Sequence, residues 1–249
     1  MFLSDLYCDE TYHGPPPDEN TKVLMRRQEI NATIDHGVKA IFFDLHGVLV
    51  DIAGWHKVAL LSAMEDVLGA IPTGLISSRH QMWKIYGGTM AQLLYMKWLG
   101  QIPYGVLHEI YDKKQEYTRE FIERRCKPIP RIIDVMNYVQ SIGLRLACVT
   151  NGNRINAEKM IDASGLSKYF EFIITREDVG GKIKPHPRPY LEARYRMKLG
   201  HKEALVIDDT SRGILSGVEA FCRTWRLKEQ ANLNVYNLMR ILHSYRCPL

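Results

Sequence analysis

Short apolar segments alternate with longer amphipathic segments through most of this chain. The apolar segments are rich in β-branched and aromatic residues, which is typical of buried strands. They cover residues 38–45, 144–150, 171–175, 204–208 and 222–227. Helical patterns follow at residues 129–142, 154–164, 187–199, 211–221 and 233–243. This alternation predicts an α/β fold with a doubly wound parallel sheet, whose sites lie beyond the carboxyl ends of its strands.

The alternation stops between Asp51 and Lys127, directly after the first predicted strand. Long helical patterns take its place at residues 55–68, 82–99 and 104–125. A helical block at this position predicts an inserted subdomain over residues 52–127. Residues 1–37 differ again, because the breaker cluster Gly14-Pro15-Pro16-Pro17-Asp18 lies in a stretch without sustained period. We therefore expect an N-terminal extension, a core formed by residues 38–51 and 128–249, and the helical insert.

Composition and charge exclude several classes of protein. With 46% apolar and 24% charged residues the chain has an ordinary globular composition. A net charge of +5 is too small and dispersed for a nucleic-acid surface, although it suits a small anionic substrate. No apolar run approaches the roughly 18 residues of a spanning helix, and the 5 scattered cysteines form no CxxC pair. We expect a cytoplasmic protein without nucleic-acid or membrane partners, and no feature sets its oligomeric state.

Polar residues capable of chemistry follow the first two core strands. The first strand ends at Asp44, and a carboxylate there can attack phosphorus as a nucleophile or bind a metal. The alternative for Asp44 is a helix or turn cap. The second strand ends in Thr150-Asn151-Gly152-Asn153 before a helix, so hydroxyl, amide and backbone N–H groups gather at a helix N-terminus. That arrangement predicts an anion site, unless Thr150 and Asn151 are only turn and capping residues.

Two further signals follow the third and fourth strands. Lys182 and Lys184 lie in a proline-containing loop before a helix, where a lysine can neutralise a phosphate and an aspartate together. Lone loop lysines are more often simply solvated. Asp208 and Asp209 end the fourth strand, and two adjacent carboxylates repel unless they share a cation. Oxygen-only ligands favour Mg²⁺. Four such signals at successive strand ends indicate a site instead of four unrelated structural roles.

These four segments resemble the motifs of the haloacid dehalogenase (HAD) superfamily. They are most similar to its branch containing beta-phosphoglucomutase and phosphoglycolate phosphatase. The motifs are FDLHGVLVD at residues 43–51, VTN at 149–151, KPHPRPY at 184–190 and VIDDTSRGI at 206–214. The resemblance covers residues 38–227 and implies a Rossmann-like HAD core with an inserted helical cap.

Carried over by motif, the resemblance implies a Mg²⁺-dependent phosphatase of a small phosphorylated metabolite. Asp44 would be the nucleophile and form an aspartyl-phosphate. The implied Mg²⁺ ligands are Asp44, His46 through its backbone carbonyl, and Asp209, with Asp208 as a further ligand or a supporting acid. The implied phosphate-binding residues are Thr150, Asn151 and Lys184. Lys184 and the metal would neutralise the charge that otherwise keeps a carboxylate away from a phosphate.

One position departs from the phosphatase pattern. The family places a second aspartate two residues after the nucleophile, as general acid and then base, and this chain has His46. Metal binding should survive, because this position contributes its backbone carbonyl. The proton-transfer role is in doubt, and general acid–base catalysis is worth about 10²- to 10⁴-fold. Since imidazole carries protons near neutral pH, His46 indicates either altered chemistry or a catalytically impaired pseudoenzyme that binds phosphate or a partner.

A carbon–halogen or carbon–phosphorus hydrolase is a third class, because those relatives also lack the second aspartate. The Asp208-Asp209 pair argues against a dehalogenase, which needs no metal. A phosphonate hydrolase would need a Schiff-base lysine in the cap, where the generic candidates are Lys57, Lys84 and Lys97. The cap sets substrate identity in this family, and its candidate residues are Trp55, His56, Arg79, His80 and the turn Gly87-Gly88-Thr89.

Overall fold

The computed structural model describes residues 37–51, 53–71, 89–98, 100 and 102–245. The chain divides into two compact units. Of the described residues, one unit contains 37–51 together with 127–245, and the other contains those between Asp51 and Lys127. Residues 1–36 of the expected N-terminal extension lie outside the described residues. None of the described helices is both long and apolar enough to cross a membrane.

Five parallel strands form one sheet in the core unit, in the order β3-β2-β1-β4-β5. Their bounds are Ala40–Phe43 for β1, Arg145–Val149 for β2, Phe172–Ile174 for β3, Ala204–Asp208 for β4 and Arg223–Arg226 for β5. Every strand falls within a segment that the apolar pattern predicted. The predicted α/β fold with a parallel sheet is therefore confirmed.

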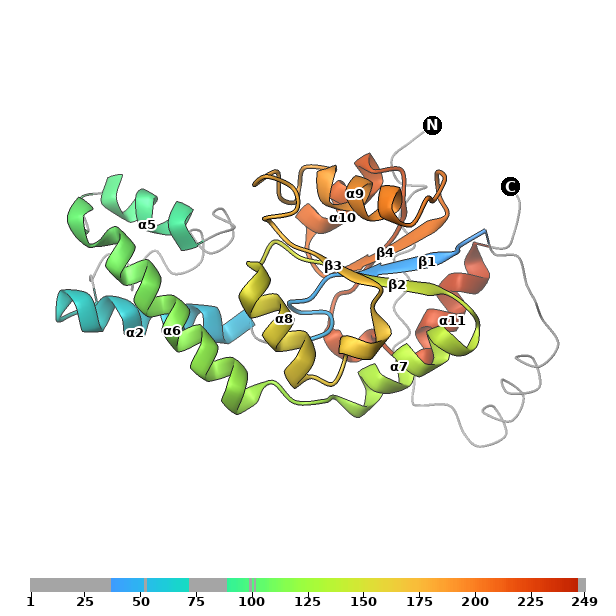
Figure 1. Ribbon diagram of the computed structural model, residues 1–249, viewed down its shortest axis with the longest axis horizontal. Coiled ribbons are helices and arrows are strands. Elements are labelled where there is room, and N and C mark those ends of the chain that lie inside the picture. The colour runs from blue at the N-terminus through green and yellow to red at the C-terminus, as the bar shows by residue number, and fades with distance from the viewer. Residues whose placement is uncertain (1–36, 52, 72–88, 99, 101, 246–249) are drawn as a thin grey trace. The chain divides into compact units, whose positions relative to one another are not determined.

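Helices cover both faces of this sheet. Their bounds are Pro130–Ser141 for α7, Arg154–Ala163 for α8, Arg188–Arg196 for α9, Ser211–Glu219 for α10 and Val235–Ser244 for α11. Figure 1 shows α9 and α10 over one face and α7 and α11 over the other. Because the sheet is covered on both sides, all four residues of β1 are buried, as expected for a parallel strand. On the α9 side, the Tyr190 ring stacks 6.4 Å from the Phe42 ring.

The order of the strands determines where a ligand can bind. β1 pairs with β2 on one side and with β4 on the other. The strands up to β3 are therefore added on one side of β1 and the later strands on the other, so the strand order reverses at β1. In open α/β sheets, ligands bind at this reversal, outside the carboxyl ends of the strands. Asp44, Thr150 and Asp209 directly follow these three strands.

Two side chains cap the helices that begin at this edge of the sheet. Asn153 precedes α8, and its Oδ1 accepts a hydrogen bond from the backbone N–H of Asn156 at 2.9 Å. Thr210 precedes α10, and its Oγ1 accepts from the backbone N–H of Gly213 at 3.0 Å. The capping residue of α8 is thus Asn153, which leaves the side chain of Thr150 for another role.

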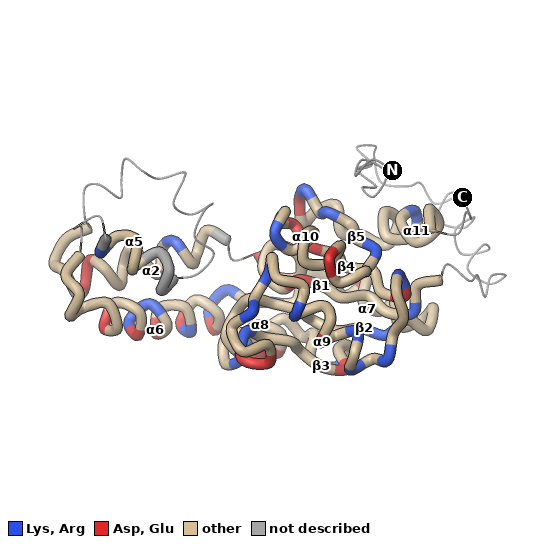
Figure 2. The backbone as a smooth tube through the Cα atoms, turned by 90° about the horizontal axis from the view of Figure 1, so that it is seen from above, with Lys and Arg blue, Asp and Glu red and all other residues tan. Residues whose placement is uncertain are grey.

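The described part of the second unit is helical. It contains α2 at Ala53–Leu68, α5 at Thr89–Trp98, a 3₁₀ turn at Tyr104–Val106 and α6 at Leu107–Arg125. Of the helix predicted at residues 82–99, only Thr89–Trp98 lies within the described part of the chain. α6 buries one residue in every three or four, and charged residues line the rest of the helix (Figure 2). This unit has a core of its own, which includes Leu60, Met64, Leu93, Met96 and Ile110.

Candidate active site

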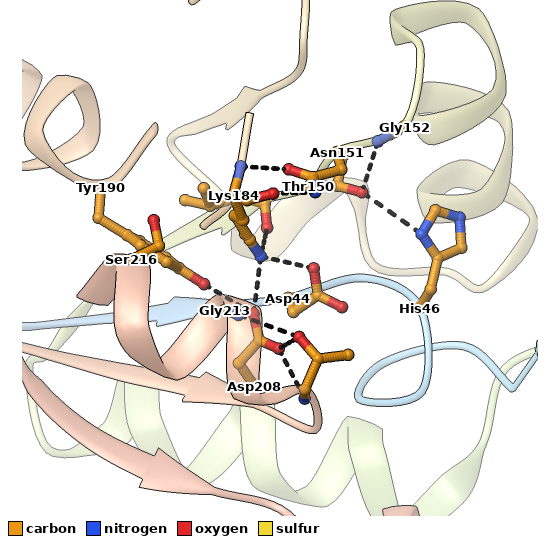
Figure 3. A network of polar contacts seen from close by, with 12 residues as sticks. Asp44, His46, Thr150, Asn151, Gly152, Lys184, Tyr190, Asp208, Gly213 and Ser216 are labelled. Carbon is orange, nitrogen blue, oxygen red and sulfur yellow. Dashed lines mark hydrogen bonds and ion pairs between the residues drawn. The ribbon is translucent and has the colours of Figure 1, made fainter. Parts of the chain in front are cut away.

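Lys184 lies at the centre of a buried polar network that joins three strand ends (Figure 3). Its ammonium Nζ donates to Asp44 Oδ1 at 2.6 Å, to Asp208 Oδ2 at 2.8 Å and to the carbonyl oxygen of Val149 at 2.7 Å. The Lys184 side chain is 3% exposed, whereas Lys182 lies on the surface. Of the two lysines in the loop, the structure therefore brings Lys184 to the carboxylates.

Burial and charge shift the proton equilibria of this network. Burial raises the pKa of Asp44 to about 7, against the opposing effect of the Lys184 ammonium. Burial alone would lower the pKa of Lys184, but the carboxylates of Asp208 and Asp44 hold that pKa well above its usual value. Lys184 therefore places a positive charge between the carboxylates of Asp44 and Asp208.

Asp208 is held by four hydrogen bonds, two at each of its oxygens. Its Oδ1 accepts from the backbone N–H and the hydroxyl of Thr210, at 2.9 and 2.7 Å. Its Oδ2 accepts from the Lys184 ammonium at 2.8 Å and from the hydroxyl of Tyr190 at 3.0 Å. At Gly213, a Cβ atom would lie 1.8 Å from Asp208 Oδ2, so only glycine fits there. Asp208 therefore serves to position Lys184.

Asp209 differs from its neighbour because one of its oxygens has no partner. Oδ1 of Asp209 is buried and receives no hydrogen bond. The loop after β1 approaches its other oxygen closely, since a Cβ atom at Gly47 would lie 2.4 Å from Oδ2. Gly47 also has a φ of +81°, which favours glycine. Burial, followed by the charge of Asp208, raises the pKa of Asp209 to about 6.

These carboxylates fit a divalent cation. Asp44, Asp208 and Asp209 each offer an oxygen, and the three oxygens lie within 4.8 Å of one another. Lys184 supplies a single positive charge to this group. Buried carboxylates are costly without full compensation, and the orphaned oxygen of Asp209 lacks the partner that a metal would provide. Oxygen-only ligands suit Mg²⁺.

Thr150 and Asn151 meet the same centre from β2. The Thr150 hydroxyl accepts a hydrogen bond from the backbone N–H of Gly152 at 3.1 Å. The Asn151 side chain binds the backbone of Lys184 twice, because its Oδ1 accepts from the N–H at 2.9 Å and its Nδ2 donates to the carbonyl at 3.1 Å. Asn151 therefore fixes the backbone from which the Lys184 ammonium extends.

The imidazole of His46 lies beside the turn that follows β2 (Figure 3). Its Nδ1 is 3.4 Å from the Thr150 hydroxyl oxygen. Its Cε1 is so close to Gly152 that a Cβ atom there would lie 3.2 Å away. The His46 ring thus faces the hydroxyl and backbone groups that were expected to bind phosphate.

The cap candidates form no comparable network among the described residues. The Trp55 ring packs 5.5 Å from the Phe121 ring. His56 lies with its Nδ1 3.2 Å from the ammonium of Lys114, a buried lysine that sequence reasoning missed. Among the lysine candidates, Lys57 is half-buried and Lys97 lies on the surface. Candidates that lie outside the described residues are Arg79, His80, Lys84, Gly87 and Gly88.

Three residues of the core network were also missed: Thr210, Tyr190 and Gly213. Tyr190 closes the KPHPRPY run, and Gly213 lies within VIDDTSRGI, so both were inside recognised motifs. Nothing in the local pattern marks them, because their importance comes from contact with Asp208.

Several known proteins are similar to this chain in sequence or in fold. The family model of the haloacid dehalogenase-like hydrolases matches residues 38–220. The chain is 26% identical to the phosphoglycolate phosphatase of Escherichia coli (strain K12) over 207 residues, covering 74% of this chain and 79% of that protein. The crystal structure of beta-phosphoglucomutase from Clostridium difficile is similar with a TM-score of 0.66 at 18% identity, covering 84% and 98% of the two chains. CbbY from Rhodobacter sphaeroides, in complex with phosphate, also has a TM-score of 0.66 at 19% identity, covering 79% and 99%.

The chain therefore belongs to the haloacid dehalogenase-like hydrolases. Within that superfamily it is similar in sequence to phosphoglycolate phosphatase and in fold to beta-phosphoglucomutase.

Proposed function

We propose that this protein is a Mg²⁺-dependent phosphatase that hydrolyses a small phosphorylated metabolite through an aspartyl-phosphate on Asp44. One observation carries the proposal. A buried lysine holds the carboxylate of Asp44 beside two further carboxylates at the reversal point of the sheet. The family relationship and the phosphoglycolate phosphatase relatives support the same activity.

The reaction proceeds in two displacements at phosphorus. An oxygen of Asp44 attacks the phosphorus of the substrate, the ester P–O bond breaks, and the leaving oxygen takes a proton from His46 as the alcohol departs. Water then attacks the same phosphorus and gives its proton to His46, the bond to Asp44 breaks, and phosphate and the free carboxylate result. Lys184 offsets negative charge during both displacements, and Thr150 with the backbone N–H groups of its turn binds the phosphoryl oxygens.

Asp44, Asp209 and the backbone carbonyl of His46 would hold Mg²⁺, while Asp208, with both oxygens already bonded, holds Lys184. The bound ion supplies positive charge that reduces repulsion between Asp44 and the phosphate. The fit rests on the orphaned oxygen of Asp209 and the excess of carboxylates over the one ammonium.

A phosphate-release screen over phosphorylated metabolites, with Mg²⁺ or with EDTA, tests the proposal. Asp44→Asn is the matched variant, because it keeps the shape of the side chain and removes the nucleophile. We expect phosphate release that depends on Mg²⁺ and is lost in Asp44→Asn. Release that persists at the wild-type rate in Asp44→Asn would contradict the aspartyl-phosphate route.

A second candidate function is a pseudoenzyme that binds phosphate or a partner without efficient turnover. The observation that favours it is His46, which stands where the family has its acid–base aspartate. Phosphate binding without release of phosphate from any metabolite would support this candidate over the first.

A further inference from the structure

Arg212 contacts the backbone of Lys184 but does not contact the carboxylates that the Lys184 ammonium binds. It is the second residue of α10, and its Nη2 donates to the carbonyl oxygen of Lys184 at 3.2 Å. The same carbonyl accepts from the Asn151 amide at 3.1 Å. The guanidinium is therefore fixed on the backbone of Lys184, one lysine side chain away from the ammonium that binds Asp44.

Arg212 also differs from the arginines around it, because it forms no ion pair with any described carboxylate. Arg154, Arg188 and Arg196 each pair with an aspartate or glutamate of their own or a neighbouring element. A guanidinium carries five N–H donors in a planar fork. At Arg212 the described residues use one of them, and the side chain is half-buried.

Resting on the proposed function, we propose that Arg212 binds a second anionic group of the substrate, a carboxylate or a second phosphate on the same small molecule. The planar fork of arginine matches both groups, since each presents two acceptor oxygens to it. Arg212 is held on the backbone of Lys184, whose ammonium binds Asp44, so both cations belong to the same strand-end site.

A second arginine, Arg226, lies on the strand beside β4. Arg226 ends β5, which pairs with β4, and it forms no ion pair with a described residue. Arg226 carries the same charge as Arg212, but no hydrogen bond or ion pair among the described residues joins it to Lys184. It provides a matched control of equal charge.

The test compares substrates that differ in their second group alone. Phosphoglycolate is paired with 2-hydroxyethyl phosphate, and glucose 1,6-bisphosphate with glucose 1-phosphate, so the two pairs separate carboxylate from phosphate recognition. We expect Arg212→Ala to lower kcat/KM by at least about tenfold for the doubly anionic member of one pair, mainly through KM. The singly anionic members should change by less than about twofold, and Arg226→Ala should affect both members of each pair alike.

Arg212→Gln guards against a folding defect, because glutamine can still donate to the Lys184 carbonyl but carries no charge. It should lose the same selectivity as Arg212→Ala. Equal losses for both members of each pair would mean that Arg212 only positions Lys184, and that result would overturn the inference. No selective loss in either variant would do the same while leaving the phosphatase proposal intact.

A binding measurement separates this inference from the proposed function. Calorimetry with Asp44→Asn protein and Mg²⁺ needs no turnover. A preference for phosphoglycolate over 2-hydroxyethyl phosphate, or for the bisphosphate over the monophosphate, should disappear when Arg212→Gln is added. If the wild type releases no phosphate but this preference and its loss are observed, the phosphatase proposal fails and the role of Arg212 stands. If no preference exists in the Asp44→Asn protein, the inference is wrong.

Discussion

At the scale of single residues, glycines decide how closely the acids can approach their neighbours. Gly213 lies on α10 against the carboxylate of Asp208, where a methyl group would overlap Oδ2 at 1.8 Å. Gly47 allows the equivalent approach of Asp209 to the loop after β1. In both cases the missing side chain provides the space that the acid occupies.

Gly213→Ala should therefore displace Asp208 and weaken its hydrogen bonds to Lys184 and Tyr190. We expect a loss of about 1–3 kcal/mol in the free energy of unfolding, as for other overpacked buried sites, together with a loss of phosphatase activity. Urea unfolding and the phosphate-release assay measure the two effects. Gly54→Ala is the control, because nothing lies within 4 Å of its Cβ position. Equal stability and activity in Gly213→Ala and the wild type would refute this account of the site.

His46 is the site residue that departs from the family motif, which has an aspartate at this position. Its imidazole lies 3.4 Å from the Thr150 hydroxyl, beside the expected phosphate position. If His46 transfers the proton to the leaving alcohol, His46→Ala should reduce kcat by about 10²-fold or more, the usual worth of general acid–base catalysis. His108→Ala, on the exposed surface of α6, should leave kcat unchanged. If instead His46→Asp raises a very low wild-type rate by about 10²-fold, the pseudoenzyme is the better description.

At the scale of elements, one acid ties the loop before Lys184 to two helices. Asp178 accepts from the backbone N–H and the hydroxyl of Thr175, both at 2.8 Å. It also pairs with Arg154 of α8 and with Arg196 of α9. Burial would raise the pKa of Asp178, but the Thr175 hydrogen bonds and the arginines hold it below its usual value.

Because the folded state lowers this pKa, Asp178 stabilises the fold above the pKa of an unfolded aspartate. That contribution is lost as the pH falls through the lower pKa of the folded protein. Asp178→Asn should cost about 1–3 kcal/mol at pH 7, the range for hydrogen bonds to charged groups. The cost should shrink below about pH 4. Glu177→Gln, at the exposed neighbouring position, should change the free energy of unfolding by less than about 0.5 kcal/mol.

The sequence reveals the central strands but not always their ends: β4 has the predicted bounds 204–208, whereas β1 covers Ala40–Phe43 of the predicted 38–45. β1 and β4 are central strands, buried on both faces, and their continuous apolar runs reveal them. β3 has 3 residues, whereas the pattern predicted five. It lies at the edge of the sheet and pairs with a neighbouring strand on one side alone. Phe172 and Ile173 are accordingly only half-buried. Motif positions could likewise place Asp44, Thr150, Lys184 and Asp209 at one edge of the sheet.

Sequence reasoning could not assign the partners within that edge. Lys184 and Asp44 are separated by 140 residues, so their 2.6 Å contact depends on the packing of the whole core. The division of labour between Asp208 and Asp209 is likewise a tertiary property, since it follows from Thr210, Tyr190 and Gly213 around one acid alone. Two adjacent aspartates read alike in a sequence, but only one of them has a free buried oxygen.

At the scale of the whole molecule, repulsion between the buried carboxylates of the site lowers the stability of the folded protein unless a cation is bound. Asp209 has a pKa raised to about 6 by burial and by the charge of Asp208. A raised pKa means that the charged form of Asp209 destabilises the folded state, increasingly as pH rises from about 4 through 6. Above pH 6 this cost is fully present unless a cation offsets it. A bound divalent cation and the neutral substitution Asp209→Asn should therefore both stabilise the protein.

The two effects should not add, and thermal unfolding can show this. In EDTA at pH 7.5, Asp209→Asn should unfold at a higher temperature than the wild type. The difference should vanish at about pH 3, where Asp209 is largely protonated in both the folded and the unfolded state. Saturating Mg²⁺ at about 100 times its Kd should raise the Tm of the wild type by about 5–10 °C, but that of Asp209→Asn far less, because a ligand is missing. Asp134→Asn removes the same charge from the exposed surface of α7 and should keep the full Mg²⁺ response. If Asp209→Asn responded to Mg²⁺ as strongly as Asp134→Asn, Asp209 would not be a ligand of the metal.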